Sequence, residues 1–102
     1  MDEQEQVAAF LAANDLTCPP AYRLLDLAAE VGELAADATA ATGYGADPDA
    51  FDVKRDELGD ALFALLALCD QLDVDAGDAL ADSLAKYETR LAEDGSAGSD
   101  AD

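Results

Sequence analysis

The residues in this chain best suited to chemistry are two pairs of carboxylates with the same spacing. Glu30 and Glu33 form an E-x-x-E pair, and Glu57 and Asp60 form an E-x-x-D pair. Residues three apart share one face of a helix, so each pair can direct two carboxylates at one point. Divalent cations such as Mg²⁺ prefer oxygen ligands of this kind and keep positions for water and substrate phosphates. The two pairs therefore indicate a candidate Mg²⁺ site, which Mn²⁺ could also fill.

The acid content of the chain weakens the argument from spacing alone. Asp and Glu number 24 in 102 residues, so chance predicts about five or six acidic pairs at this spacing, and the sequence has six. A solvated acidic face is the alternative, since the first pair lies opposite an apolar stripe on a helical wheel. Matched glycines, Gly32 and Gly59, favour a site, because a mid-helix glycine costs about 1 kcal/mol relative to alanine. They indicate close approach of a backbone or a ligand.

The few basic residues supply the other candidates. Lys86 and Arg90 stand four apart and therefore share a helix face, where they could bind phosphate or pair with acids such as Asp82. We expect structural roles for the other three, which are Arg23, Lys54 and Arg55. The chain has no histidine, which excludes a Ser-His-Asp triad and a histidine metal site.

The net charge of −19 restricts the partners and the surroundings of the chain. It argues against binding a nucleic acid backbone or an anionic membrane surface. It also favours a salt-rich, halophilic cytoplasm, because the Debye length falls from roughly 10 Å at 0.1 M salt to roughly 3 Å at 1 M. An acidic protein from an ordinary cell is the alternative. Two cysteines without a C-x-x-C motif and an acidic start predict a reducing, cytoplasmic location.

Hydrophobic periodicity and breakers predict an all-α fold. We expect four helices, over residues 2–14, 20–42, 50–72 and 76–93. Asp49 and Asp75 are the expected N-caps of the third and fourth helices, and Gly43 is the expected stop of the second. Residues 1–94 are predicted to form one four-helix-bundle-like domain, followed by a disordered acidic tail over 95–102.

The second helix carries an apolar stripe, and the third is apolar on every side over residues 61–69. The stripe comprises Leu24, Leu27, Ala28, Val31, Leu34, Ala35 and Ala38. A helix that is apolar all round must be buried all round, and nine residues are too short to span a bilayer. Four helices cannot easily enclose one of their own, so we expect a homodimer or homotetramer with the third helix near the interface.

Three segments together resemble the MazG-type nucleotide pyrophosphohydrolases of the all-α NTP pyrophosphatase superfamily. They are LLDLAAEVGELA at 24–35, DELGDALFALL at 56–66 and SLAKYETR at 83–90. The resemblance covers about residues 7 to 92. It implies a MazG fold and a Mg²⁺-dependent enzyme that cleaves a nucleoside triphosphate into the monophosphate and pyrophosphate, as in nucleotide pool clean-up.

The resemblance also implies roles for individual residues. The implied Mg²⁺ ligands are Glu30, Glu33, Glu57 and Asp60, of which Glu33 or Glu57 would take the proton of the attacking water. The implied phosphate-binding residues are Lys86 and Arg90, with Tyr87 positioning the nucleotide. The chain departs from the family pattern at Ala29, often an acid, and at Ser83, often an asparagine.

Two rival interpretations remain open from the sequence. A phosphoribosyl-ATP pyrophosphatase belongs to the same superfamily and has a similar size, although the apolar third helix and the Lys-Tyr-x-x-Arg segment fit MazG better. A non-catalytic helical interaction module, with its acids serving as salt adaptation, comes from a different class. Mg²⁺-dependent release of pyrophosphate separates the enzymes from the module.

Overall fold

The computed structural model describes residues 1–95, which contain α helices, one short 3-10 helix and no strand. The elements are α1 (Asp2–Ala13), α2 (Pro20–Ala41), η1 (Pro48–Ala50), α3 (Arg55–Gln71) and α4 (Ala76–Asp94). The all-α prediction with four α helices is confirmed. The predicted disordered tail lies, from residue 96 onward, outside the described residues. No described helix is both long enough and apolar enough to cross a membrane.

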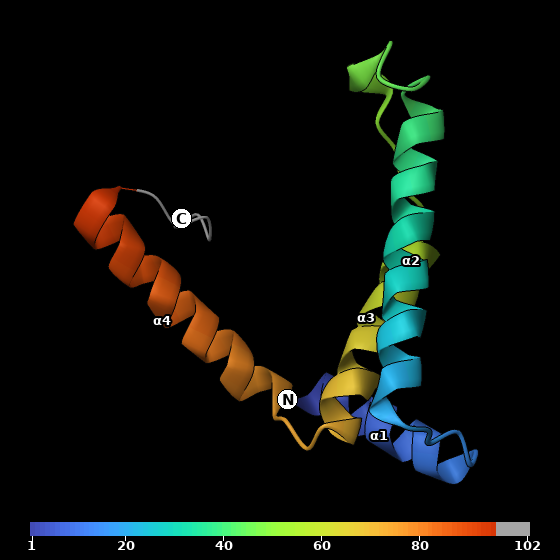
Figure 1. Ribbon diagram of the computed structural model, residues 1–102, viewed down its shortest axis with the longest axis vertical. Helices are drawn as coiled ribbons and strands as arrows, with labels where there is room; N and C mark the ends of the chain where they lie inside the picture. Colours follow the sequence, from blue (N-terminus) through green and yellow to red (C-terminus); the bar gives the residue numbers. More distant parts are fainter. Residues whose placement is uncertain (96–102) are drawn as a thin grey trace.

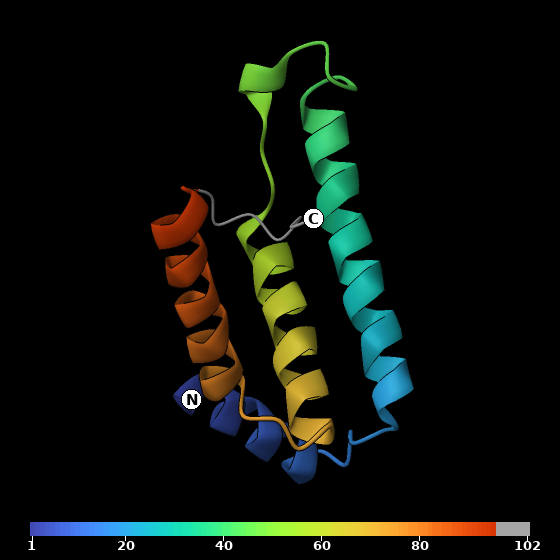
Figure 2. The ribbon, with the colours of Figure 1, turned by 60° about the vertical axis from the view of Figure 1, so that its left-hand side comes forward.

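Helices α2 and α3 form an antiparallel pair, and α1 packs against α3 at the end where α2 begins (Figures 1 and 2). The buried apolar side chains come from α1 and α3 and are Leu11, Ala64, Leu66 and Ala67. Phe10 and Phe63 join the two helices edge to face, with ring centroids 6.0 Å apart. This geometry is favourable for aromatic pairs beyond the area that they bury. The small core therefore holds α1 and α3 together.

A buried arginine fixes α2 against the C-terminal end of α3. Arg23 Nε donates to Gln71 Oε1 at 3.1 Å, and Arg23 Nη2 donates to the carbonyl of Leu16 in the loop before α2. Arg23 also pairs with Asp26 at 3.3 Å. The Gln71 amide in turn donates to the carbonyl of Cys18. The structural role predicted for Arg23 is therefore confirmed.

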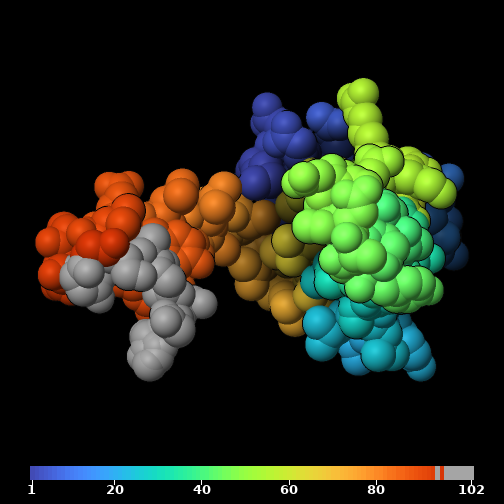
Figure 3. All heavy atoms as spheres, turned by 90° about the horizontal axis from the view of Figure 1, so that it is seen from above, coloured from blue at the N-terminus to red at the C-terminus, as the bar shows by residue number. Residues whose placement is uncertain are grey.

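Helix α4 diverges from the rest of the protomer beyond the turn at residues 72–75 (Figures 1 and 3). The molecule is accordingly open, with extents of 44 × 39 × 22 Å. A row of leucines along α4 (Leu80, Leu84 and Leu91) is 52–53% exposed. Apolar exposure of this extent along one helix is typical of a surface that another chain covers.

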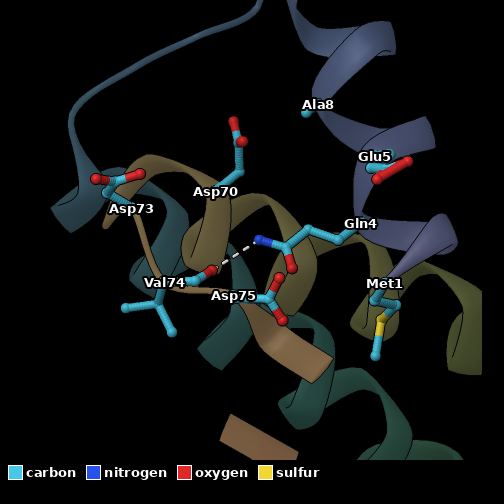
Figure 4. Close-up of a pocket in the computed structure, with 8 residues that line it drawn as sticks. All are labelled: Met1, Gln4, Glu5, Ala8, Asp70, Asp73, Val74 and Asp75. Carbon is cyan, nitrogen blue, oxygen red and sulfur yellow. Dashed lines mark hydrogen bonds between the residues drawn. The ribbon is translucent and has the colours of Figure 1, made fainter. Parts of the chain in front are cut away.

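The turn that sets the direction of α4 is held by a side chain from α1 (Figure 4). Gln4 Nε2 donates to the carbonyl of Val74 at 2.8 Å, and the backbone N–H of Ala76 donates to Gln4 Oε1 at 2.7 Å. Asp75 caps α4 by accepting from the backbone N–H of Asp78 at 2.8 Å, which confirms the predicted N-cap. Gln4 thus binds the chain on both sides of this cap.

The prediction for the start of the third helix was wrong. Helix α3 begins at Arg55, five residues after the expected start, and Asp49 lies inside η1 instead of capping α3. The intervening backbone at Phe51 and Lys54 is extended. Residues 51–53 are an aromatic, an aspartate and a β-branched residue, all weaker helix formers than Lys54 and Arg55, which follow. The stop at Gly43 is confirmed, since α2 ends at Ala41 and Gly43 adopts a φ of +59°.

The apolar stripe of α2 does not coincide with the face that meets α3. Leu24 and Val31 of the stripe are 55% and 52% exposed, whereas Leu27 and Leu34 are half-buried. Helix α3 shows the same pattern, since its apolar run is buried on one side only and Leu62 remains 50% exposed. The sequence predicts that the apolar run of α3 is buried on every side. Within the single chain it is buried on one side only.

Candidate functional site

Packing of α2 on α3 brings both acidic pairs into one cluster. Glu30 on α2 and Glu57 on α3 are half-buried, while Glu33 and Asp60 lie at the exposed side. Glu30 feels the charges of both Glu33 and Asp60, and Glu57 feels the charge of Glu33. The four carboxylates predicted from the sequence are therefore neighbours in the structure.

Burial and crowding raise the pKa of Glu30 above its ordinary value. Burial is the largest cause, followed by a hydrogen bond with Glu33 and the charges of Glu33, Asp60 and Asp26. One oxygen of this side chain, Oε2, is fully buried and has no hydrogen-bond partner. A negative charge at this position is therefore poorly compensated by the protein itself.

The pKa of Glu57 is raised further, to about 7. The largest cause is a hydrogen bond with Asp37, followed by burial and by the charge of Asp37; Glu33 adds to the rise, and Lys54 opposes it. Two carboxyl groups in direct contact share a proton more readily than two charges. Glu57 is therefore poised to gain or lose a proton near neutral pH.

Asp37 is the member of the cluster that the sequence analysis missed. It stands four residues after Glu33 and seven after Glu30, a spacing that returns to the same face of α2. Asp37 does not belong to a pair three residues apart with Glu30 or Glu33, but the helical period places it on the same face as both. With Asp37, the cluster contains five carboxylates.

Three oxygens of this cluster are buried without a hydrogen-bond partner: Glu30 Oε2, Asp37 Oδ2 and Glu57 Oε2. Buried carboxylate oxygens are costly unless a cation or a donor compensates them. Their chemistry fits a hard divalent cation, which takes oxygen ligands. In the described part of the chain, however, no three such side chains already converge on one point with metal-ligating geometry. The donor set is thus present, and metal binding requires the side chains to close in.

Beside the cluster lies a cavity of about 340 Å³. It is lined by Arg23, Asp26, Glu30, Asp60, Phe63 and Ala64. One wall is therefore acidic and another apolar. The cavity lies next to the candidate ligands Glu30 and Asp60, where a bound substrate would meet them.

The matched glycines do not mark close approach of another backbone, as the sequence had indicated. A Cβ at Gly32 or at Gly59 would meet no described atom within 4 Å outside the neighbouring residues and the helix's own backbone. Helices α2 and α3 pack through other faces, so these two positions stay open. Of the two explanations offered for these glycines, a close backbone or a close ligand, the described residues supply no close backbone, and the structure shows open space beside each acid pair.

The residues predicted to bind phosphate are not brought to the acid cluster within one protomer. Lys86, Tyr87 and Arg90 lie on α4, which projects away from the α2–α3 pair (Figures 1 and 3). Lys86 is exposed, with its Nζ 5.0 Å from the ring centre of Tyr87. The acidic and basic halves of the predicted site are therefore separate in the single chain.

Comparison with known families identifies the class of protein that this helical arrangement belongs to. The family model of the MazG nucleotide pyrophosphohydrolase domain matches residues 22–93, which is more than two thirds of the chain. The chain therefore belongs to the MazG nucleotide pyrophosphohydrolase domain family. The match spans α2, α3 and α4, and with them both acidic pairs and the Lys86–Arg90 segment. Searches of curated proteins and of solved structures gave no match.

Family membership supports a pyrophosphohydrolase at the level of the family. Enzymes of this family generally use a divalent metal. A carboxylate cluster with unpartnered buried oxygens agrees with that property. The non-catalytic module is the weaker interpretation, because it explains neither the match nor the cluster.

Proposed function

We propose that this chain is a Mg²⁺-dependent nucleoside triphosphate pyrophosphohydrolase, with Mn²⁺ as a substitute metal. It would hydrolyse (d)NTPs to the monophosphate and pyrophosphate and so clear unwanted nucleotides. The observation that carries the proposal is the cluster of facing carboxylates with three unpartnered buried oxygens, two of them on residues of the matched acidic pairs.

Four carboxylates would hold the metal: Glu30, Glu33, Glu57 and Asp60. When bound, Mg²⁺ supplies neutralisation of phosphate charge and a lowered pKa for the attacking water. The cluster itself repels a triphosphate, because it gathers five carboxylates. Of the charges that affect the pKa of Glu57, that of Lys54 alone is positive. The cluster therefore has to bind a cation before it can bind an anionic substrate.

Glu57 would accept the proton of the attacking water. A half-buried carboxylate next to the other candidate ligands can act as a general base toward a water held there. As the proton moves to Glu57, the water oxygen bonds to phosphorus, the α–β anhydride bond breaks, and pyrophosphate leaves. Glu33, at the exposed side of the cluster, is the second candidate for this role.

The phosphate-binding half would come from α4 of another copy of the chain. Lys86 and Arg90 would contact phosphate, and Tyr87 would position the nucleotide. Support comes from the direction of α4 away from its own acid cluster and from the half-exposed leucines along it. A homodimer or homotetramer would cover these leucines and bring each α4 to a neighbouring acid cluster. Light scattering in high salt should therefore give a mass of two or four chains, and a stable monomer would contradict this arrangement.

The activity can be tested directly on the purified full chain. In molar KCl with Mg²⁺, a panel of (d)NTPs should yield stoichiometric monophosphate and pyrophosphate, and chelation of the metal should stop the reaction. Failure to release pyrophosphate from any (d)NTP would refute the proposal. Release of orthophosphate in place of pyrophosphate would assign the chain to a different phosphohydrolase reaction.

A further inference from the structure

We propose that Asp37 is a positioning residue of the candidate site, which holds the carboxyl group of Glu57 toward α2. The inference rests on the proposed function, because it concerns the residue assigned there as ligand and base. It adds a fifth carboxylate that lies outside both acidic pairs.

The register of α2 on α3 places Asp37 opposite Glu57. The hydrogen bond between Arg23 and Gln71 fixes the two helices at one end. Asp37 lies fourteen residues after Arg23, and Glu57 lies fourteen residues before Gln71. Fourteen residues are about four helical turns, so both steps return to the facing side after the same rise of about 21 Å. In an antiparallel pair, equal steps in opposite chain directions bring Asp37 opposite Glu57.

The surroundings of the two carboxyl groups agree with this register. Asp37 and Glu57 are both half-buried, and hydrogen bonding with Asp37 is the largest cause of the raised pKa of Glu57. Each side chain nonetheless keeps one fully buried oxygen without a partner, Asp37 Oδ2 and Glu57 Oε2. The contact therefore uses one side of each group and leaves Glu57 Oε2 available for a cation.

Lys54 competes with Asp37 for the carboxyl group of Glu57, which is why this group needs a positioning residue. It precedes Glu57 by three residues and attracts its charge. Residues three apart at the start of a helix readily pair. Without Asp37, the Glu57 side chain is expected to turn toward Lys54 and away from Glu30, Glu33 and Asp60. Asp37 thus acts through Glu57 and not on the substrate.

The test measures binding of Mn²⁺ alone to the full chain, by calorimetry and by the loss of the free-ion EPR signal. Asp37→Ala should weaken Mn²⁺ binding about 10- to 100-fold, as removal of an outer-shell partner does. Asp37→Asn should stay within about threefold of wild type, because the amide still hydrogen-bonds to the Glu57 carboxylate. Asp56→Ala is the matched control, since it removes an exposed carboxylate adjacent to Glu57 and should change binding less than about twofold.

A second variant tests the competitor. Adding Lys54→Ala to Asp37→Ala should recover most of the lost Mn²⁺ affinity, because the alternative partner of Glu57 is gone. If Asp37→Ala does not fold, as judged by circular dichroism, Asp37→Ser replaces it, because its side chain is too short to reach across the interface.

Three results would overturn the inference: Asp37→Ala binding Mn²⁺ as Asp56→Ala does, Asp37→Asn failing as badly as Asp37→Ala, or Lys54→Ala giving no recovery. These results leave the proposed function intact so long as wild type binds Mn²⁺ and releases pyrophosphate. Wild type that does neither would refute the proposed function and this inference together.

Discussion

The α2–α3 pair and α4 are both amphipathic helical regions, but α2 and α3 pack on each other whereas α4 projects away from them. Helices α2 and α3 are fixed in register by the buried Arg23 and gather five carboxylates between them. Helix α4 is tied down at its first turn by Gln4 and Asp75 and then leaves the body of the molecule. The acidic half of the candidate site is therefore assembled within one chain, whereas Lys86 and Arg90 lie on a helix that projects away from it.

The difference has a physical origin in what each interface buries. The α2–α3 contact is built from specific polar bonds, such as Arg23 to Gln71, which set register as well as stability. The face of α4 carries leucines about half exposed, and apolar contacts are less directional. A region of the first kind can hold ligands in place, whereas a region of the second kind is suited to association.

The largest effect is expected at the acid cluster. Glu57→Gln keeps the size of the side chain but removes a metal ligand and the proton acceptor, so the rate of pyrophosphate release should fall about 10²- to 10⁴-fold. Asp56→Asn, which removes a neighbouring exposed carboxylate, should retain most of the activity. Full activity of Glu57→Gln would mean that the cluster is not the active site.

The next largest effect is expected where α2 is fixed to α3. Arg23→Ala leaves the carbonyl oxygen of Leu16 and the side-chain oxygen Oε1 of Gln71 without their donor, so the free energy of unfolding should fall by about 2–4 kcal/mol. Arg55→Ala removes an exposed arginine and should cost less than about 0.5 kcal/mol. Urea unfolding at matched salt and chain concentration measures both, and equal costs would refute the structural role of Arg23.

A smaller effect is expected at the turn before α4. Gln4→Ala removes both hydrogen bonds to the turn, at 2.8 and 2.7 Å, and should lower the free energy of unfolding by about 1–2 kcal/mol. Gln6→Ala, on the exposed side of α1, is the control and should be nearly neutral. Because Gln4 sets the start of α4, its loss should also raise KM for the nucleotide. An unchanged KM would show that the direction of α4 does not depend on this clamp.

The smallest effect is the pH dependence of the metal-free protein. The pKa of Glu57 rises from 4.5 to about 7 on folding because Asp37 and burial favour its protonated form; Glu33 adds to the rise and Lys54 opposes it. The folded state then binds more protons than the unfolded chain, so this contribution to stability is full below pH 4.5 and is lost as pH rises through 7. Thermal unfolding without metal should show a Tm that falls over this range, and Glu57→Gln should flatten the profile. A wild-type Tm that rises over this range faster than that of Glu57→Gln would contradict the raised pKa.

Local features of the sequence were sufficient to predict the helices and most of the cluster. Asp75 caps α4 through its own neighbour Asp78, and the acids three apart share a face, because both depend only on helix geometry. The non-local features were not predictable in this way. The hydrogen bonds of Arg23 help to set the face of α2 that meets α3, and hydrophobic periodicity does not include such bonds. Because that face was not predicted, Asp37 was not predicted either.

The direction of α4 belongs to the same non-local class. Gln4 lies about seventy residues before the turn that it holds, and nothing in its surroundings along the chain marks it as a cap for another helix. The start of α3 was misjudged for a different reason, since Pro48 and Asp49 begin a short 3-10 turn that resembles a helix start in sequence. Patterns within one helix were therefore reliable, and relations between helices required the structure.

Complementation tests whether each site combines the acids of one chain with α4 of another. Glu57→Gln and the double variant Lys86→Ala/Arg90→Ala should each be inactive alone. Co-expressed with two different tags and purified through both, their mixed dimer should contain one intact site of two and recover about half of the wild-type activity. A mixed dimer as inactive as its parents would contradict the account and place both halves of the site in the same chain.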